Sequence, residues 1–154
     1  MSDLAARSPD IVLRHADDMD ALLACWAVIA ELRPSLVNVD DWMNRAWTMM
    51  QDGYRLLAAW RGAEAVGIAG YRIMQNLIHD RFLYVDDLVT IPEARGSGVS
   101  AALLTKLAAI GTTEGCGRLV LDTARTNSAA RRFYQREGMI DAVVGFVKPL
   151  GEPA

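Results

Sequence analysis

Three β-like runs follow one another without a helix between them, and this order limits the possible folds more than any other feature. The runs are residues 54–60, 65–74 and 82–90, and they are joined by Arg61-Gly62-Ala63-Glu64 and by the segment 76–80. Short apolar runs with tight links are typical of an antiparallel meander. A doubly wound sheet is disfavoured, because it would place a helix after each strand.

The segments on either side complete an α+β pattern. Apolar periodicity predicts a strand at 11–14 and helices at 16–32 and 39–52, then, after the three runs, a helix at 98–113, a strand at 118–122, a helix at 127–137 and a last strand at 143–148. Asp40 or Asp41 is the expected N-cap of the helix at 39–52, and Gly53 is expected to end it in a left-handed conformation. The second half alternates strands and helices, which favours parallel pairing there. The predicted order is β-α-α-β-β-β-α-β-α-β. We expect a mixed central sheet of about six or seven strands, flanked by about four helices.

Length and charge restrict the class of protein. The 154 residues fit one domain, predicted at 11–150, behind a flexible arm at 1–10. The net charge of −3 offers no basic surplus for nucleic acid. No apolar stretch is long enough to cross a membrane, and the N-terminus lacks a signal-peptide pattern. We therefore expect a cytoplasmic protein.

The residues that commonly bind metals are scattered. Cys25 and Cys116 show neither metal-site nor disulfide spacing, so we interpret them as two reduced thiols. His15 and His79 are isolated from each other and from any ligand cluster. No metal site is predicted.

A glycine-rich loop stands between the strand 82–90 and the helix 98–113. It reads Arg95-Gly96-Ser97-Gly98-Val99-Ser100. The first N–H groups of a helix have no partner within the helix, and the macrodipole adds positive charge at the same end. Glycines let a bulky group approach the backbone. The loop therefore predicts a phosphate site that needs no lysine.

Two common phosphate loops fit less well. A Walker A loop would require Gly-Lys-Ser/Thr, which is absent. A dinucleotide fingerprint could use Gly96, Gly98 and Ala101, and Asp122 lies 24 residues after Gly98, so spacing alone leaves that alternative open. That fingerprint should open an early βαβ unit, however, and this loop follows three consecutive strands.

Two motifs resemble those of the GNAT superfamily of acyltransferases. Arg95-x-x-Gly98-x-Ser100 resembles its motif A, Gln/Arg-x-x-Gly-x-Gly/Ala, and Ser100 departs from the usual Gly or Ala. The run 85–90 looks like the strand that precedes this motif. Asn127-x-x-Ala130-x-x-Phe133-Tyr134-x-x-x-Gly138-Met139 resembles the superfamily's later motif. The resemblance extends from residue 11 to residue 150 and is weakest over the first 60.

The resemblance implies a donor and a set of coenzyme contacts. The donor would be acetyl-CoA or another acyl-CoA. The backbone of Leu88 and Val89 would pair with the pantetheine arm, and one of those N–H groups would polarise the thioester carbonyl. Asn127 would contact the pantetheine region, and Tyr134 would protonate the leaving thiolate. The pyrophosphate would lie on Arg95, Gly96, Ser97, Gly98, Val99 and Ser100.

The implied reaction is direct transfer of the acyl group to a primary amine of a small molecule or of lysine, without an acyl-enzyme. Asp86 and Asp87 should face opposite sides of their strand. Asp87 is the candidate general base, acting through water, although water alone could suffice. In this superfamily the first helices usually line the acceptor pocket. Candidate acceptor contacts are Glu31, Arg33, Trp42, Tyr71 and Asp86, although for the first four a plain surface or core role is the simpler interpretation.

Other interpretations remain open at this stage. Tyr134 could be a packing residue, Asn127 an ordinary helix cap and Arg95 a surface side chain. The domain could also be a silent acyl-CoA-binding sensor of the same fold. Because only one strand is predicted after Gly138, a partner subunit could complete the sheet edge as a homodimer. The acceptor and the acyl group are not specified by the sequence.

Overall fold

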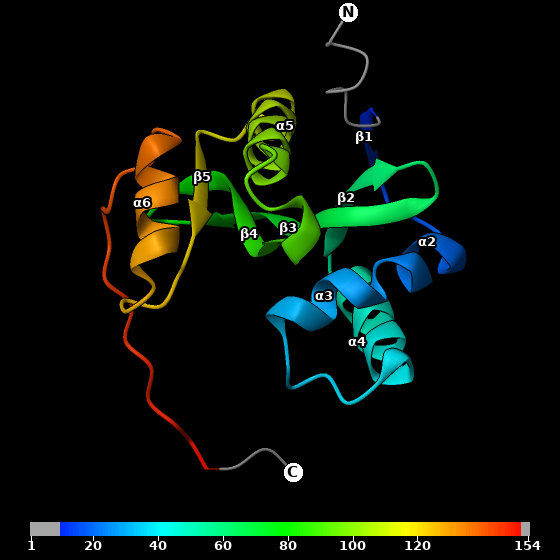
Figure 1. The fold of residues 1–154 in the computed structure, drawn as a ribbon. Helices are drawn as coiled ribbons and strands as arrows, with labels where there is room; N and C mark the ends of the chain where they lie inside the picture. Colours follow the sequence, from blue (N-terminus) through cyan, green and yellow to red (C-terminus); the bar gives the residue numbers. More distant parts are fainter. Residues whose placement is uncertain (1–9, 152–154) are drawn as a thin grey trace, which may run out of the picture. The chain divides into compact units, whose positions relative to one another are not determined.

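The computed structural model describes residues 10–151, which form parts of two compact units, 1–121 and 122–154. The predicted arm at 1–10 lies almost wholly outside the described residues. Figure 1 labels the elements in chain order. The first unit holds β1 (Ile11–His15), α2 (Met19–Ala24), α3 (Trp26–Leu32), α4 (Val39–Gln51), β2 (Arg55–Arg61), β3 (Glu64–Asn76), β4 (Asp80–Thr90), the 3-10 turn η1 (Pro92–Ala94), α5 (Val99–Thr113) and β5 (Arg118–Leu121). The second holds α6 (Ser128–Arg136).

The strands form one mixed sheet in the order β1-β2-β3-β4-β5. The first three pairings are antiparallel and β4 pairs with β5 in parallel. The predicted meander is confirmed, and the parallel pairing expected in the second half is confirmed for β4 and β5. The described residues contain five strands and five α-helices, rather than the expected six or seven strands and four helices.

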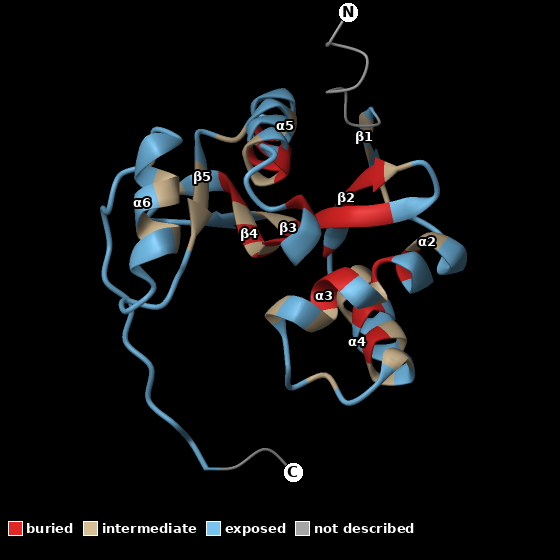
Figure 2. Cartoon of the chain, in the orientation of Figure 1, coloured by how far each residue is buried: buried red, intermediate tan, exposed pale blue. Residues whose placement is uncertain are grey.

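Helices cover both faces of the sheet in the first unit, as Figure 1 shows. One core joins α2, α3 and α4 to one face through residues such as Leu22, Ile29 and Trp42. The other core packs Val99 and Leu103 of α5 on the opposite face. Figure 2 shows the buried residues gathered on the central strands and on the inner sides of these helices. The sheet thus separates a layer formed by α2, α3 and α4 from a layer formed by α5.

The predicted helix at 16–32 is two helices that meet at Cys25. The Cys25 N–H bonds to the carbonyls of Ala21, Leu22 and Leu23, and the residue ends α2 and precedes α3. Leu22, Cys25 and Ile29 are nevertheless all buried, at steps of three and four residues. The apolar stripe therefore continues across the break, and periodicity could not reveal it.

A different residue from the predicted one caps α4. The Asn38 side chain accepts a hydrogen bond from the Asp41 N–H at 3.0 Å, so Asn38 replaces Asp40 or Asp41 as the N-cap. Asp41 in return accepts from the Val37 N–H at 3.0 Å. Asn38 thus satisfies an N–H group that the helix start leaves unpaired, and Asp41 holds the residue that precedes the cap. Gly53, with φ of +94°, lies just beyond the end of the helix, where a left-handed residue was expected.

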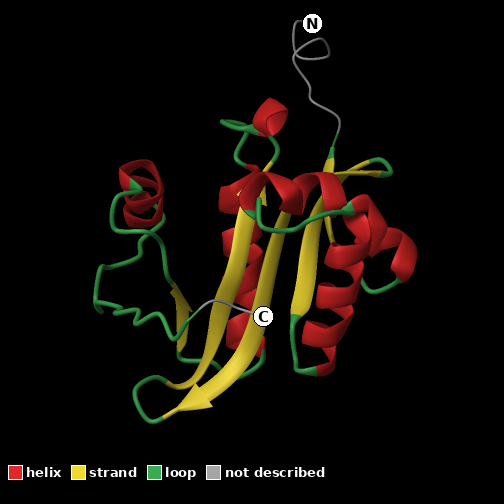
Figure 3. Ribbon diagram, turned by 90° about the horizontal axis from the view of Figure 1, so that it is seen from below, coloured by secondary structure: helices red, strands yellow, loops and turns green. Residues whose placement is uncertain are grey.

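In the second unit, α6 is followed by a segment without regular structure. Figure 3 draws the described part of this segment as loop throughout. The strand predicted at 143–148 is absent, and Val143, Val144, Phe146 and Val147 are exposed. Their apolar and β-branched side chains suit a strand, but a strand needs a neighbouring backbone to pair with. Propensity alone does not supply that neighbour.

Candidate active site

The edge of β4 is only half paired. β4 pairs with β3 over its whole length, whereas β5 pairs with it only from Phe82 to Val85. Beyond Val85 the parallel pairing stops, so the backbone from Asp86 to Thr90 has no strand of the described sheet on that side. Such an edge presents N–H and C=O groups that an extended ligand can pair with. Leu88 and Val89 lie on this stretch, half-buried and buried respectively.

A β-bulge interrupts β4 where the pairing to β5 ends. Tyr71 is opposite Val85 and Gly70 is opposite Asp87, so Asp86 is the extra residue. A bulge leaves its extra residue outside the ladder and re-aims the neighbouring side chains. The expectation that Asp86 and Asp87 face opposite sides is therefore wrong, because strict alternation does not hold across a bulge. Both carboxylates join one cluster.

That cluster consists of Arg33, Tyr54, Arg72, Asp86 and Asp87. The Tyr54 hydroxyl donates to Asp87 Oδ2 at 2.7 Å, and Arg33 Nε donates to Asp87 Oδ1 at 2.9 Å. Arg72 Nε donates to Asp86 Oδ2 at 3.1 Å, and its guanidinium lies 5.6 Å from the centre of the Tyr54 ring. Each buried charge therefore has an opposite charge or a donor beside it, as buried charges require.

Burial changes the acidity of two members of the cluster. Burial raises the pKa of Tyr54 well above its ordinary value, and the negative charge of Asp87 raises it further, so the phenol keeps the proton that it donates. Burial also raises the pKa of Asp86, although the adjacent Arg72 opposes the change. The sequence did not point to Tyr54 or Arg72, because their partners lie 33 and 14 residues away in the chain.

The glycine loop lies between β4 and α5, with Arg95, Gly96, Ser97 and Gly98 all exposed. Gly96 and Gly98 have φ of +80° and +85°, a region that side chains disfavour. Gly98 is the N-cap of α5 and carries no side chain to cap it. The first N–H groups of this 15-residue helix therefore have no capping side chain, which is the arrangement that an anionic ligand can complete.

Two contacts hold the start of α5 against the sheet. A Cβ added at Gly67 of β3 would lie 2.7 Å from Val99 Cγ1, so the helix approaches the strand as closely as a glycine allows. Thr90 and Ser100 share a hydrogen bond of 2.7 Å between their hydroxyls. Ser100, the position that departs from the superfamily pattern, thus ties the helix start to the end of β4.

The two other predicted coenzyme residues lie in the second unit. Asn127 is the N-cap of α6, and its side chain accepts from the Ala130 N–H at 3.1 Å. Tyr134 is half-buried, with its ring edge-on to Phe133 at 5.4 Å between centroids. Burial raises the pKa of Tyr134, which keeps the phenol protonated near neutral pH. Both residues therefore have a structural role in α6 that is compatible with coenzyme contact.

The predicted acceptor residues divide between the two layers. Glu31 is exposed on α3, in the same layer as Arg33. Tyr71 is fully buried in the other core, and its hydroxyl is 2.7 Å from His15 Nε2. Its burial argues against the predicted substrate contact. Trp42 is buried as well, with its indole N–H bonded to the Leu22 carbonyl.

The remaining titratable groups supply no further centre. Within residues 10–151 no three His, Cys, Asp or Glu side chains are grouped so that they could hold a metal ion. Both cysteines are free, and burial raises the pKa of Cys25 to about 12, so this thiol stays protonated. None of the helices between residues 10 and 151 combines the length and the apolar character that a membrane crossing demands.

Curated relatives match part of the chain. The thialysine N-epsilon-acetyltransferase of Bos taurus is 28% identical over 81 residues, a stretch that is 53% of this chain and 48% of that protein. The Mus musculus protein of the same name is 26% identical over 81 residues. The match therefore spans about half the length of these relatives.

Solved structures match nearly the whole chain. The aminoglycoside N-acetyltransferase AAC(6')-Iy, solved in complex with CoA, has a TM-score of 0.82 at 19% identity, covering 95% of this chain and 99% of that one. A Trypanosoma brucei acetyltransferase has a TM-score of 0.76 at 21% identity, covering 92% of this chain and all of that one. At these identities the likeness shows the fold.

The family comparison covers both motifs of the sequence. The model of the acetyltransferase (GNAT) family matches residues 19–139, which is well over half of the chain. The matched segment includes the strand β4, its bulge, the glycine loop and α6. The family predicted from the two motifs is thereby confirmed, and the chain belongs to the acetyltransferase (GNAT) family.

Proposed function

We propose that this protein transfers an acetyl or related acyl group from acyl-CoA to a primary amine of a small molecule or of a lysine side chain. The observation that carries the proposal is the continuity of two features. The half-paired edge of β4 at 86–90 is followed, after Ile91 and the short turn η1, by the glycine loop and the start of α5. One extended ligand with a phosphate end would use both features.

The coenzyme would bind along this continuous path. The pantetheine arm would pair with the backbone of Leu88 and Val89, and the pyrophosphate would lie on the N–H groups of residues 95–100. The Thr90–Ser100 hydrogen bond supports this assignment because it fixes the loop to the end of the strand before any ligand arrives. A preorganised loop loses less conformational entropy when it binds.

The reaction would proceed by direct attack of the neutral amine on the thioester carbonyl. The nitrogen forms the new bond to carbon, the carbon–sulfur bond breaks, and an N–H group of Leu88 or Val89 stabilises the intermediate oxyanion. Tyr134 would give its proton to the departing thiolate. Its raised pKa supports this role, since the phenol enters the reaction protonated.

The amine proton would leave through water toward Asp87. Asp87 Oδ1 faces two nitrogens of Arg33, whereas Oδ2 accepts from the Tyr54 hydroxyl alone among the described hydrogen bonds. Oδ2 therefore retains a second acceptor position, which a water molecule can use. Asp86 and Glu31 would add negative charge on the acceptor side, which favours a cationic amine. The similar thialysine and aminoglycoside N-acetyltransferases are named for acceptors that carry amines, which supports an amine acceptor here.

Thiol release tests the proposed function. Acetyl-CoA is incubated with a panel of cationic, neutral and anionic amines, and free thiol is measured for the wild type and for Tyr134→Phe. We expect turnover with cationic amines and a loss of kcat in the variant. Binding of CoA measured by calorimetry should be preserved in both. Coenzyme binding without turnover of any amine would favour a silent acyl-CoA sensor, and failure to bind any acyl-CoA would refute both functions.

We also propose that the protein forms a homodimer. Support comes from the exposed apolar side chains that follow α6, among them Ile140, Phe146, Val147 and Leu150. A second copy could pair with this segment, whose sequence suits a strand. Light scattering at micromolar concentration should give twice the chain mass of 16.9 kDa. A monomer mass at that concentration would refute the proposal.

A further inference from the structure

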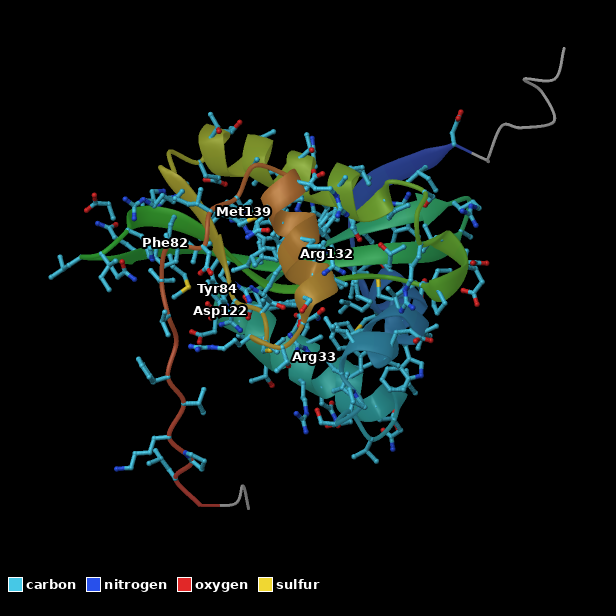
Figure 4. The ribbon with its side chains drawn as sticks, turned by 60° about the vertical axis from the view of Figure 1, so that its left-hand side comes forward. Arg33, Phe82, Tyr84, Asp122, Arg132 and Met139 are labelled. Carbon is cyan, nitrogen blue, oxygen red and sulfur yellow. The ribbon has the colours of Figure 1, made fainter. Side chains whose placement is uncertain are left out.

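Arg33 connects the helical layer to the bulge of β4. It directly follows α3, where Figure 4 labels it, and its partners lie 53 and 54 residues later in the chain. Its Nε and Nη2 both lie 2.9 Å from Asp87 Oδ1. Its Nη2 also donates to the backbone carbonyl of Asp86 at 2.8 Å. One guanidinium therefore holds a side chain and a peptide group at the same time.

The peptide that Arg33 holds is the one that the bulge leaves outside the ladder. Asp86 is the extra residue, so its backbone groups have no regular place in the pairing with β3. The C=O and N–H of a trans peptide are coplanar and point in opposite directions. The guanidinium that fixes the Asp86 carbonyl thus also fixes the direction of the Asp87 N–H. The next peptide groups along the strand belong to Leu88 and Val89.

The other members of the cluster cannot replace this contact. Tyr54 precedes β2 and Arg72 lies on β3, and they donate hydrogen bonds to the side chains of Asp87 and Asp86 respectively. Arg33 is the member that comes from the helices, on the side of the sheet where Glu31 lies. A rearrangement of the segment after α3 would therefore be transmitted to the backbone of β4.

We propose that Arg33 is a positioning residue for acyl transfer, which orients the Asp86–Asp87 peptide and thereby the N–H groups of Leu88 and Val89. The inference rests on the proposed function, because those N–H groups matter only if they hold a thioester carbonyl. Arginine suits the task since its planar fork reaches two acceptors with fixed geometry. A lysine would keep the charge but offers a single ammonium in place of the fork.

Three variants separate positioning from charge and from folding. Arg33→Ala removes both contacts, and Arg33→Lys keeps the charge. Arg45→Ala is the matched control, because Arg45 is also an exposed arginine paired with an aspartate, Asp41, at 2.9 Å within the same helical layer. The kinetic constants for acyl-CoA and for the amine are measured for each variant, together with Tm.

We expect Arg33→Ala to lower kcat by on the order of 10- to 100-fold, the loss that small displacements of reacting groups produce. The Kd for CoA should change by no more than about threefold, because the loop at 95–100 and its backbone donors are retained. Arg33→Lys should lie between alanine and the wild type. Guanidinium at millimolar concentration should restore part of the kcat of Arg33→Ala, with sodium chloride at equal concentration as the control. Arg45→Ala should keep wild-type kcat.

Two results would overturn the inference. The first is wild-type kcat in Arg33→Ala when the wild type turns over an amine. The second concerns the backbone directly and needs no turnover: the amide N–H resonances of Asp87 and Leu88 in labelled protein. We expect Arg33→Ala to shift them and guanidinium to move them back. Unchanged resonances, equal to those of Arg45→Ala, would contradict the positioning role whether or not the enzyme is active. Absence of turnover in the wild type would instead refute the proposed function.

Discussion

Replacement of Gly67 by alanine should displace the glycine loop indirectly. Gly67 lies on β3 and packs against the start of α5, which follows the loop. The added Cβ would lie 2.7 Å from Val99 Cγ1, 3.3 Å from Leu103 Cδ1 and 3.4 Å from Thr90 Oγ1. Real Cβ contacts are ordinary from 3.4 Å outward, so Val99 must retreat by about 3.4 − 2.7 = 0.7 Å. Val99 is the first residue of α5, and its movement displaces the helix start whose N–H groups are the proposed phosphate donors.

The expected magnitude follows from overpacking. Inserting a methyl group into a filled core costs about 1–3 kcal/mol. In a chain of this length each kcal/mol lowers Tm by roughly 2–4 °C. We therefore expect Gly67→Ala to lower Tm by roughly 2–12 °C and to raise the Kd for CoA, since the backbone donors leave their positions. Thermal unfolding and calorimetric titration with CoA measure both effects.

Gly111→Ala is the control, because Gly111 lies on α5, the helix that begins at Val99. Its added Cβ would meet Leu83 and Cys116 no closer than 3.6 Å, which is ordinary contact. Alanine inside a helix is better than glycine by about 0.5–1 kcal/mol, so this variant should be as stable as the wild type or more so. Adding Val99→Ala to Gly67→Ala should recover part of the CoA affinity, because it removes the overlapping methyl. Equal CoA affinity in Gly67→Ala and Gly111→Ala would refute the assignment of the loop.

Three further predictions test the cluster, the hydrogen bond between Thr90 and Ser100, and the half-buried His15. Tyr54→Phe removes one donor from the buried Asp87 carboxylate and should lower the free energy of unfolding by about 1–3 kcal/mol in urea titrations; an unchanged free energy would count against this hydrogen bond. Ser100→Ala breaks the bond to Thr90 and should cost about 1 kcal/mol of stability and weaken CoA binding, whereas an unchanged Kd would show that the tether is dispensable. Burial lowers the pKa of His15 below its ordinary 6.5, so the unfolded chain binds a proton that the folded chain refuses; stability is retained above pH 6.5 and lost as the pH falls below it. His15→Gln should reduce that loss between pH 7.5 and 5.5, and an identical pH dependence in the variant would count against the assignment.

The sequence predicted the local pieces that depend on neighbouring residues. Apolar runs predicted the meander, and Gly96 and Gly98 marked the loop because their backbone conformation suits glycine. The predicted N-cap of α4, Asp40 or Asp41, lies two or three residues after the observed cap, Asn38. Both Asn and Asp cap helices well, so residue type alone does not choose between them. The segment at 143–148 has the composition of a strand, yet strand formation also requires a pairing partner.

By itself the sequence determined the family and the position of the glycine loop before α5, because two motifs with fixed spacing depend only on residues near one another in the chain. The tertiary structure decided the surroundings of Asp86 and Asp87. A one-residue bulge places both carboxylates in one cluster, and their partners Arg33, Tyr54 and Arg72 come from three other segments. Alternation along a strand is a local rule, whereas a bulge and a long-range ion pair depend on how distant segments pack. The contact between Arg33 and the β4 backbone was for this reason visible only in the folded chain.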